Sequence, residues 1–380
     1  MKIIVDEAIS FAQEVFSRFG DVELHHGRSI TNSICKDADI LITRSITDVN
    51  ESLLENAKVK FVGTATIGTD HIDLNYLNKK GITFSSAAGC NADAVTEYVF
   101  TSLFYLLVKY ELKIKNLTLG IVGCGNIGSR VARLAEAAGF NVLVNDPPLK
   151  RQTGDNKFLE LADVLKADII TFHVPLNMGG IDNTYHLIDE VKLKRIKDGA
   201  VIINSSRGAV IDNAALNKLI PQKKFITSLD VWENEPNLNS DLLKLVELGT
   251  PHIAGYSYEG KVNGTKMIYD SLCKFLGAEN TWKPSLPKVE DNLLFADNST
   301  PLENIINKIF SSVYKIKNDD ALFRRIINMP KEKRAVYFES LRKEYKLRRE
   351  FPNYIIALKE TNDQLEYVLD AFRFNIIKNT

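Results

Sequence analysis

Leu119-Gly-Ile-Val-Gly-Cys-Gly-Asn-Ile-Gly128 is the stretch that decides the fold, and Phe140-Asn-Val-Leu-Val-Asn-Asp146 completes it. The apolar run 119–122 ends in glycine, as a buried parallel strand does. An alanine- and leucine-rich run over 129–138 predicts a helix, and the second quoted stretch predicts the next strand. Between the first strand and the helix the spacing is G-x-G-x-x-G, with glycines at Gly123, Gly125 and Gly128.

This strand, turn, helix and strand predict a dinucleotide site. The first glycine permits a tight turn, the second lets a pyrophosphate approach the backbone, and the third lets helix and strand pack closely. The helix N-terminus directs free N–H groups and a positive dipole end at the phosphates. Asp146 follows about twenty residues later, where its carboxylate can accept from both ribose hydroxyls and would repel a 2′-phosphate. We therefore predict NAD as the cofactor, while Lys150 and Arg151 keep NADP open.

Composition narrows the class of protein. At 380 residues the chain is long enough for about two or three domains. Its hydrophobic fraction of 45% and charged fraction of 25% predict a soluble globular protein, and zero net charge gives no field that recruits nucleic acid or a membrane. The four cysteines form no C-x-x-C pair, which indicates a reducing compartment and no metal site. With no signal peptide and no membrane-spanning run visible, we predict a cytoplasmic protein.

Strand-like and helix-like segments alternate from the N-terminus, which predicts a parallel sheet with helices on both faces. Two of its strands are followed by polar residues, Arg44-Ser45 after the strand at 39–43 and the run 64–70 after the strand at 60–63. Such residues can form an anion cradle beyond the strand ends. The alternative is a solvated loop in which Thr69 or Asp70 caps the following helix, and local sequence leaves both open.

The predicted fold class is α/β, with two Rossmann-like doubly wound domains and a small C-terminal α+β domain. Residues 1–92 and 256–284 form the predicted substrate domain, since 256–277 reads as a helix that returns to it. Residues 93–255 form the NAD domain and 285–380 the C-terminal domain, after a linker marked by two prolines. We interpret the basic run 342–349, within a helix predicted at 334–349, as a solvated helix face and not a binding patch.

Chemistry-bearing residues follow three later strands. Arg207 follows a very apolar strand and precedes a glycine, where a guanidinium can hold a carboxylate through two parallel hydrogen bonds. Among the six histidines, His252 is the best acid–base candidate, because it follows another predicted strand. A carboxylate beside it would favour the imidazolium. Glu235 is the natural partner, but local sequence does not exclude Glu233.

Five ordered motifs resemble those of the D-2-hydroxyacid dehydrogenases. They are Gly-Cys-Gly-Asn-Ile-Gly at 123–128, His-Val-Pro-Leu at 173–176, Asn-Ser-Ser-Arg-Gly at 204–208, Asp-Val-Trp-Glu-Asn-Glu-Pro at 230–236 and Pro-His-Ile-Ala-Gly at 251–255. The resemblance covers about three quarters of the chain. The stretches 5–7, 43–54, 60–71 and 249–261, with the extra C-terminal unit, resemble a branch of that family that acts on a phosphorylated 2-hydroxy acid. Two departures, Ala88 for proline and Ser206 for cysteine, touch no charged catalytic position.

The resemblance assigns roles residue by residue. The catalytic residues it implies are Arg207 on the substrate carboxylate, Glu235 as partner, and His252 as acid–base. Substrate contacts are implied for Ser45, Thr66 and Tyr256. NAD contacts are implied for Gly123, Gly125, Asn126, Ile127, Gly128, Asp146, Val174, Ser205, Ser206, Asp230 and Gly255.

The predicted activity is NAD-dependent oxidation of a small phosphorylated 2-hydroxy acid, with a homodimer formed through the C-terminal domain. One alternative is a phosphoglycerate or other D-2-hydroxyacid dehydrogenase, which would share the catalytic trio. Another, from a different class, is a non-catalytic NAD-sensing binding protein. That reading predicts NAD binding without turnover, and the intact arginine, glutamate and histidine argue against it.

Overall fold

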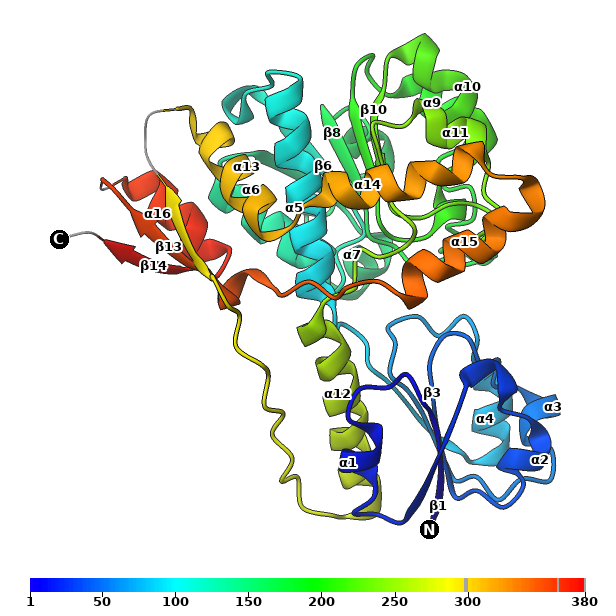
Figure 1. Cartoon of the computed structure of the whole chain (residues 1–380). Coiled ribbons are helices and arrows are strands. Elements are labelled where there is room, and N and C mark those ends of the chain that lie inside the picture. The colour runs from blue at the N-terminus through cyan, green and yellow to red at the C-terminus, as the bar shows by residue number, and fades with distance from the viewer. Residues whose placement is uncertain (297–299, 361, 379–380) are drawn as a thin grey trace. The chain divides into compact units, whose positions relative to one another are not determined.

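The computed structural model of the chain describes residues 1–296, 300–360 and 362–378 (Figure 1). Contacts divide it into two compact units. The first unit contains residues 1–91 and 257–287, and the second unit contains 92–256 and 288–380. The second unit therefore contains both the predicted NAD domain and the C-terminal segment. The boundary that we predict between these two parts stays a prediction.

The first unit is built on five parallel strands in the order β2-β1-β3-β4-β5. Their bounds are β1 (Lys2–Asp6), β2 (Asp21–His25), β3 (Ile40–Thr43), β4 (Phe61–Thr64) and β5 (Thr83–Ser86). Successive residues of a strand face opposite sides of the sheet, so Ile3 and Val5 pack against the helices on one face and Ile4 packs against those on the other. The first layer holds α1 (Ala12–Phe16) and α12 (Tyr258–Leu276). The second holds α2 (Asn32–Cys35), α3 (Glu51–Leu54) and α4 (Leu74–Lys80).

The second unit contains a six-stranded parallel sheet in the order β11-β10-β9-β8-β6-β7. The strands are β6 (Thr118–Val122), β7 (Asn141–Asn145), β8 (Ile169–Phe172), β9 (Val201–Asn204), β10 (Ile226–Leu229) and β11 (Leu248–Gly249). The order reverses at β6, because the chain adds β7 on one side and then β8 on the other. Open α/β sheets bind ligands beyond the carboxyl ends of the strands at such a point. The predicted doubly wound α/β class is confirmed.

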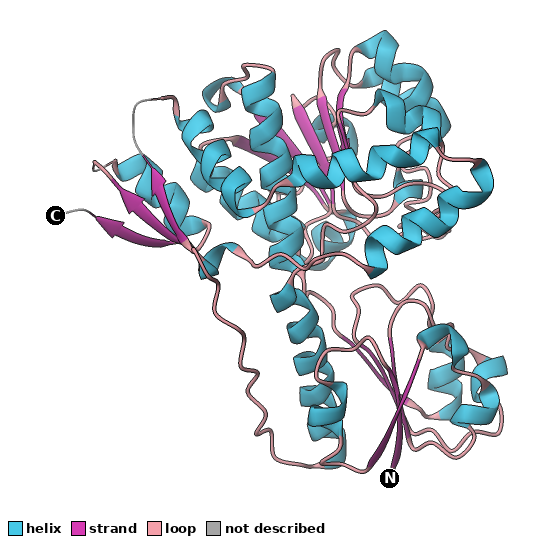
Figure 2. Ribbon diagram, in the orientation of Figure 1, coloured by secondary structure: helices cyan, strands magenta, loops and turns pink. Residues whose placement is uncertain are grey.

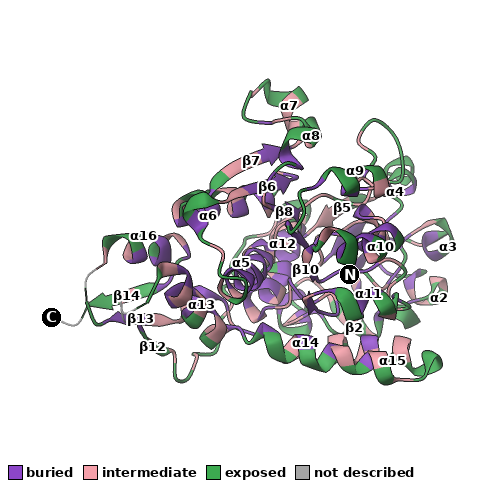
Figure 3. Ribbon diagram, turned by 90° about the horizontal axis from the view of Figure 1, so that it is seen from above, coloured by how far each residue is buried: buried purple, intermediate pink, exposed green. Residues whose placement is uncertain are grey.

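Helices cover both faces of this sheet (Figure 2). One core contains α5 (Ala92–Lys109), α6 (Gly128–Ala138) and α13 (Leu302–Val313), and α5 is almost wholly buried (Figure 3). The other core contains α9 (Glu190–Arg195), α10 (Asn213–Lys223) and α11 (Ser240–Leu245). The shorter α7 (Pro147–Thr153) and α8 (Leu161–Val164) follow β7. Short 3₁₀ turns span Gly27–Ser29, Ile114–Asn116, Gly208–Val210, Arg325–Asn328 and Phe351–Asn353.

The C-terminal segment of the second unit is a small α+β structure. Its parallel strands lie in the order β12-β13-β14, namely β12 (Leu293–Ala296), β13 (Ile355–Leu358) and β14 (Asn375–Lys378). Its helices are α13, α14 (Ile316–Arg324), α15 (Lys331–Lys343) and α16 (Asp363–Ala371). Side chains of α13, α16 and this sheet share one core with α5.

The prediction of a solvated helix face over 342–349 is wrong. Helix α15 ends at Lys343, and the residues after it are not helical. Arg348 is buried and Arg342 is largely so. Charged side chains are excluded from interiors only when their hydrogen bonds are unmet, and Arg348 finds backbone acceptors that sequence periodicity does not show.

No helix in the described part of the chain is both long and apolar enough to cross a membrane.

Candidate active site

The backbone geometry of the three glycines after β6 is compatible with the roles that their spacing predicts. Gly123 has φ +91°, and a Cβ there would lie 2.6 Å from the carbonyl oxygen of His173. A Cβ on Gly128 would lie 1.9 Å from the carbonyl oxygen of Gly123, so only glycine fits this close packing. Gly125, in contrast, faces open space, since nothing lies within 4 Å of its added Cβ. That leaves room for a phosphate against the backbone.

The N-terminus of α6 is suited to an anion. Ile127 is its N-cap residue, and no side chain caps the helix there, so its first N–H groups can donate to a ligand. Asn126 is exposed in the same turn. Val174 lies on the other side of the turn, with its Cγ1 2.8 Å from a Cβ added to Gly123. The residues present therefore fit the pyrophosphate of NAD.

Asp146 directly follows β7 and is the N-cap residue of α7. Its Oδ1 accepts the N–H of Leu149 at 3.0 Å and its Oδ2 accepts the N–H of Cys124 at 2.7 Å. An ionised carboxylate offers about four acceptor positions, so about two remain for ribose hydroxyls. The bond to Cys124 also holds the carboxylate beside the glycine turn.

We expect Asp146→Ala to raise the KM for NAD by about 10- to 100-fold, since hydrogen bonds to a charged group contribute about 1.5–3 kcal/mol. The same change removes the carboxylate that repels a 2′-phosphate, so the preference for NAD over NADP should narrow. Initial rates with each cofactor measure both effects. An unchanged KM for NAD would contradict the assignment.

The loop that carries Arg207 is fixed by its neighbours. The Asn204 side chain accepts from the N–H of Ser206 at 3.0 Å and donates to the carbonyl of Arg207 at 3.0 Å. Gly208 allows a close backbone approach, because a Cβ there would lie 2.0 Å from the carbonyl carbon of Trp232. This close approach holds the loop that carries Arg207 against the segment that contains Glu235. The hydroxyl of Ser205 is buried and has no hydrogen-bond partner among the described residues.

His252 and Glu235 form the central pair of the site. The Nδ1 of His252 lies 2.7 Å from Oε2 of Glu235, and the other Glu235 oxygen accepts the N–H of Trp232 at 2.7 Å. Burial opposes ionisation of Glu235, but the charge and hydrogen bond of His252 outweigh it and lower the pKa of this carboxyl. The carboxylate thus orients Nδ1, which leaves Nε2 as the ring nitrogen that can face a substrate.

Glu233, the alternative that local sequence left open, contacts another histidine. Its Oε1 lies 2.7 Å from Nε2 of His186, and its Oε2 accepts the N–H of Asn213 at 2.8 Å. The carboxylate of Asp212 lies near this pair, and the oxygen and nitrogen atoms that could bind a metal are within 4.8 Å of one another.

His173 is a poor candidate for the acid–base residue. Burial lowers the pKa of its imidazole to about 3, so the ring is neutral and unsuited to acid–base work.

Asp230 supports the backbone around His252. The His252 N–H donates to the carbonyl of Asp230 at 2.7 Å. The Asp230 carboxylate accepts hydrogen bonds from the Thr250 hydroxyl at 2.6 Å and from the N–H groups of Ile253 and Ala254 at 2.8 and 2.9 Å. Asp230 is only 1% exposed. His252 has φ +58°, a conformation costly for a non-glycine residue, so this anchoring offsets backbone strain at the acid–base residue. The predicted contact of Asp230 with NAD stays a prediction.

Arg348 holds the same loop from the C-terminal segment. Its Nη2 donates to the carbonyls of Ala94 and Ala254, each at 2.6 Å, and its Nη1 donates to that of Tyr256 at 3.2 Å. The guanidinium also lies over the ring of Tyr314, 4.3 Å from its centroid. The sequence motifs gave no signal for this contact, because the acceptors are backbone atoms about 90 and 250 residues away along the chain.

Arg348→Met should lower the free energy of unfolding by about 3 kcal/mol or more, because it leaves several buried carbonyls without donors. Urea unfolding of the full chain, followed by tryptophan fluorescence, measures this. A loss below about 1 kcal/mol would show that water or a rearranged loop satisfies the carbonyls.

Two predicted substrate contacts lie in the first unit. Ser45 follows β3 and is exposed, while Thr66 follows the neighbouring strand β4. The Thr66 hydroxyl lies 2.8 Å from that of Thr64, whose oxygen is 3.1 Å from Nε2 of His71. The structure thus places both residues at one edge of this sheet. Tyr256 and Gly255 belong to the second unit, in the loop after His252.

Two family models match the chain. Residues 107–254 match the NAD-binding domain of the D-isomer specific 2-hydroxyacid dehydrogenases, which contains the glycine turn, Arg207, Glu235 and His252. Residues 286–370 match a domain of unknown function, DUF3410.

Relatives match over almost the whole chain. The erythronate-4-phosphate dehydrogenase of Proteus mirabilis (strain HI4320) is 42% identical over 99% of this chain and 99% of its own length. That of Escherichia coli O127:H6 (strain E2348/69 / EPEC) is 44% identical over 94% of each chain. A solved structure, D-lactate dehydrogenase of Aquifex aeolicus complexed with NAD and lactic acid, is 26% identical with a TM-score of 0.57. It covers 73% of this chain and 96% of its own.

Proposed function

Because the chain belongs to the erythronate-4-phosphate dehydrogenases, a branch of the D-isomer-specific 2-hydroxyacid dehydrogenases, we propose that it oxidises 4-phospho-D-erythronate. It is an NAD-dependent dehydrogenase, and the products are (R)-3-hydroxy-2-oxo-4-phosphobutanoate, NADH and a proton. The observation that carries the proposal is the His252–Glu235 pair, with Nδ1 and Oε2 2.7 Å apart. It stands at the carboxyl edge of the sheet that also bears the glycine turn and Arg207.

The proposed mechanism gives each residue one task. When bound, NAD accepts the hydride that leaves C2 of the substrate. His252 takes the proton of the C2 hydroxyl at Nε2, as a general base. Glu235 stabilises the imidazolium that results, and its lowered pKa keeps it ionised for this purpose. Arg207 holds the substrate carboxylate in a bidentate pair, which fixes the orientation of C2.

A substrate panel tests this activity. NADH formation should be fastest in kcat/KM with 4-phospho-D-erythronate, and slower with 3-phospho-D-glycerate, D-lactate and the phosphate-free D-erythronate. We expect at least about a 100-fold preference over D-erythronate, the scale of a lost charged interaction in a desolvated site. Equal rates on the phosphate-free acid would refute the proposed substrate, and NAD binding without any turnover would indicate a sensing protein.

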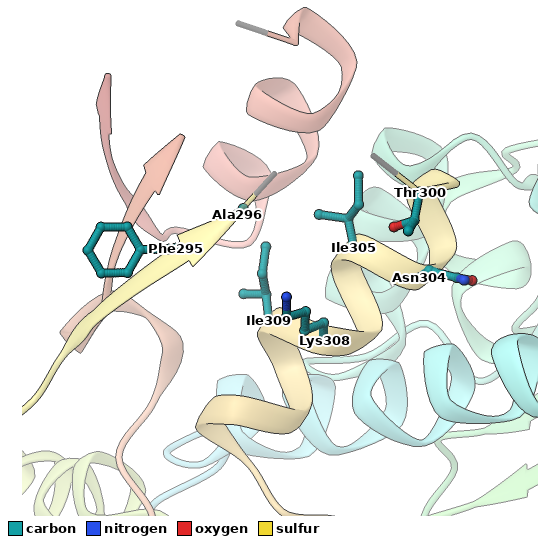
Figure 4. A pocket seen from close by; sticks show the side chains of 7 residues that line it. All are labelled: Phe295, Ala296, Thr300, Asn304, Ile305, Lys308 and Ile309. Atoms are coloured by element: carbon teal, nitrogen blue, oxygen red, sulfur yellow. The ribbon is translucent and has the colours of Figure 1, made fainter. Parts of the chain in front are cut away.

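The proposed assembly is a homodimer through the C-terminal segment. Phe295 is 59% exposed on β12 and Ile377 is 46% exposed on β14, and both lie in one row across the sheet with Ala357 between them. Residues of β12 and α13, among them Ala296, Ile305 and Ile309, line a pocket of about 210 Å³, and the Phe295 ring points away from α13 (Figure 4). Ala357 itself is buried, and the two exposed apolar side chains that flank it support association with a second copy. Sedimentation equilibrium should give twice the chain mass.

The proposed setting is the cytoplasm, in the biosynthesis of pyridoxal 5′-phosphate. The cysteines support a reducing compartment, since all four are free thiols. In that setting the 2-oxo acid product would be passed to the next step of vitamin B6 synthesis.

A further inference from the structure

We propose that Arg342, on the last turn of α15, binds the phosphate group of the substrate. This inference rests on the proposed function and assigns the anion site that the catalytic trio leaves unexplained. Arg207 accounts for the carboxylate of the substrate. Its phosphate carries about −1.5 to −2 charges at pH 7 and needs a cation of its own. The C-terminal segment supplies that cation.

Arg342 lies beside the loop that follows His252. Its Cζ is 5.9 Å from the ring centroid of Tyr256, a predicted substrate contact, and 5.8 Å from that of Phe338 on its own helix. The side chain is only 19% exposed. Two aromatic rings thus flank the guanidinium and direct a charged group, usually kept in solvent, toward the active-site loop.

The guanidinium has a side-chain hydrogen bond with Tyr256, but part of its hydrogen-bonding capacity is unused. Its Nε is buried and has no hydrogen-bond acceptor among the described residues. Its ion-pair partner Glu339 is 3.7 Å from Nη1, beyond the range of a good hydrogen bond. Arg348, by comparison, donates to several backbone carbonyls. A buried donor without an acceptor costs free energy unless a ligand satisfies it.

The charges around Arg342 also connect it to the catalytic pair. Burial opposes its positive charge, but Tyr256 and Glu235 raise the pKa of the guanidinium. Arg342 is in turn one of the groups that lower the pKa of Glu235. The guanidinium therefore remains charged beside the active-site loop, where it can attract a dianionic ligand.

Arg44 is a weaker candidate for the same task. It follows β3 in the first unit, beside Ser45, but its Nε is 3.1 Å from Oδ2 of Asp6, a fully buried carboxylate. A guanidinium already neutralised by a buried acid attracts a phosphate less than one whose acid partner is distant.

The test compares Arg342→Met with Arg334→Met. Arg334 lies on the same helix and donates to Met329 O, Ile327 O and Ser240 Oγ, away from the His252 loop. We expect Arg342→Met to lower kcat/KM for 4-phospho-D-erythronate by about 100-fold, mainly through KM, with KM for NAD unchanged. Arg334→Met should change kcat/KM by less than about threefold. Arg342→Lys, which keeps the charge, should recover part of the loss.

Two inhibitors separate phosphate binding from a general effect on the site. Inorganic phosphate should compete with the phosphorylated substrate, and its inhibition constant should rise at least about 10-fold in Arg342→Met. The inhibition constant of D-erythronate should stay within about threefold. Equal weakening of both inhibitors would overturn the proposal, because it would show that Arg342 positions the loop. A rise in KM for NAD would overturn it in favour of the cofactor phosphates.

A wrong substrate assignment and a wrong role for Arg342 would give different experimental results. If the wild-type chain makes no NADH from 4-phospho-D-erythronate, the proposed function fails, while calorimetric binding of inorganic phosphate to the NAD-loaded chain still tests Arg342. Binding that Arg342→Met abolishes and Arg334→Met retains would support the phosphate site, and binding equal in both variants would overturn it. Thermal unfolding of each variant checks that it is folded.

Discussion

His252→Ala should lower kcat by about 10²- to 10⁴-fold, the typical contribution of general acid–base catalysis. The loss follows because the variant lacks the imidazole that is proposed to take the hydroxyl proton as the hydride leaves. KM for NAD should stay within about threefold, since the glycine turn and Asp146 lie on other strands of the sheet. Steady-state rates with saturating NAD measure kcat, and cofactor fluorescence titration measures NAD binding.

His186→Ala is the matched control for this variant. His186 also lies 2.7 Å from a glutamate, Glu233, so both variants break a histidine–carboxylate pair of the same length. We expect the His186 variant to keep kcat within about threefold, because that pair is tied to the start of α10 through Asn213. Near-normal turnover in His252→Ala, or an equal loss in both variants, would contradict the assigned base.

Arg207→Met should lower kcat/KM by about 10²- to 10³-fold, chiefly through a higher KM for the substrate. Truncating one partner of a buried, hydrogen-bonded charge pair costs about 2–5 kcal/mol, and each 1.4 kcal/mol is a factor of ten. Arg207→Lys should remain impaired, because an ammonium cannot make the bidentate pair that a guanidinium makes with a carboxylate. Normal kcat and KM in Arg207→Met would show that the guanidinium does not contact the substrate.

The fold class and the placement of the candidate site residues at one sheet edge can be predicted from the sequence for one physical reason. A parallel sheet places the carboxyl ends of its strands at one edge, so residues just after apolar runs gather there in space. Gly123, Asp146, Arg207 and His252 each follow such a run, on β6, β7, β9 and β11. The glycine spacing locates the turn after β6 to the residue, because the backbone approaches at Gly123 and Gly128 leave no room for a side chain.

The features that the sequence does not predict depend on long-range contacts with backbone atoms. Asp230 supports the His252 loop through N–H groups, and Arg348 does so through carbonyls, neither of which has a side-chain signature. The basic run around Arg342 reads as a solvated helix, since charge alternation cannot reveal where the helix ends. Local sequence also left Glu233 and Glu235 open, and only the fold distributes them between His186 and His252.

The C-terminal segment therefore contacts the loop after His252 in its own chain, in addition to its proposed role in assembly. Arg348 contacts the loop after His252, and Arg342 lies against Tyr256 in that loop. A change that loosens this segment should consequently affect both stability and turnover. All of these residues belong to the second unit.

A single-turnover reaction of 4-phospho-D-erythronate carrying deuterium at C2 tests the central claim most directly. The account predicts that the reduced nicotinamide acquires the deuterium and that His252→Ala slows its appearance. Mass spectrometry of the cofactor detects the label. Deuterium released to water with unlabelled NADH, or no NADH at all, would contradict the account.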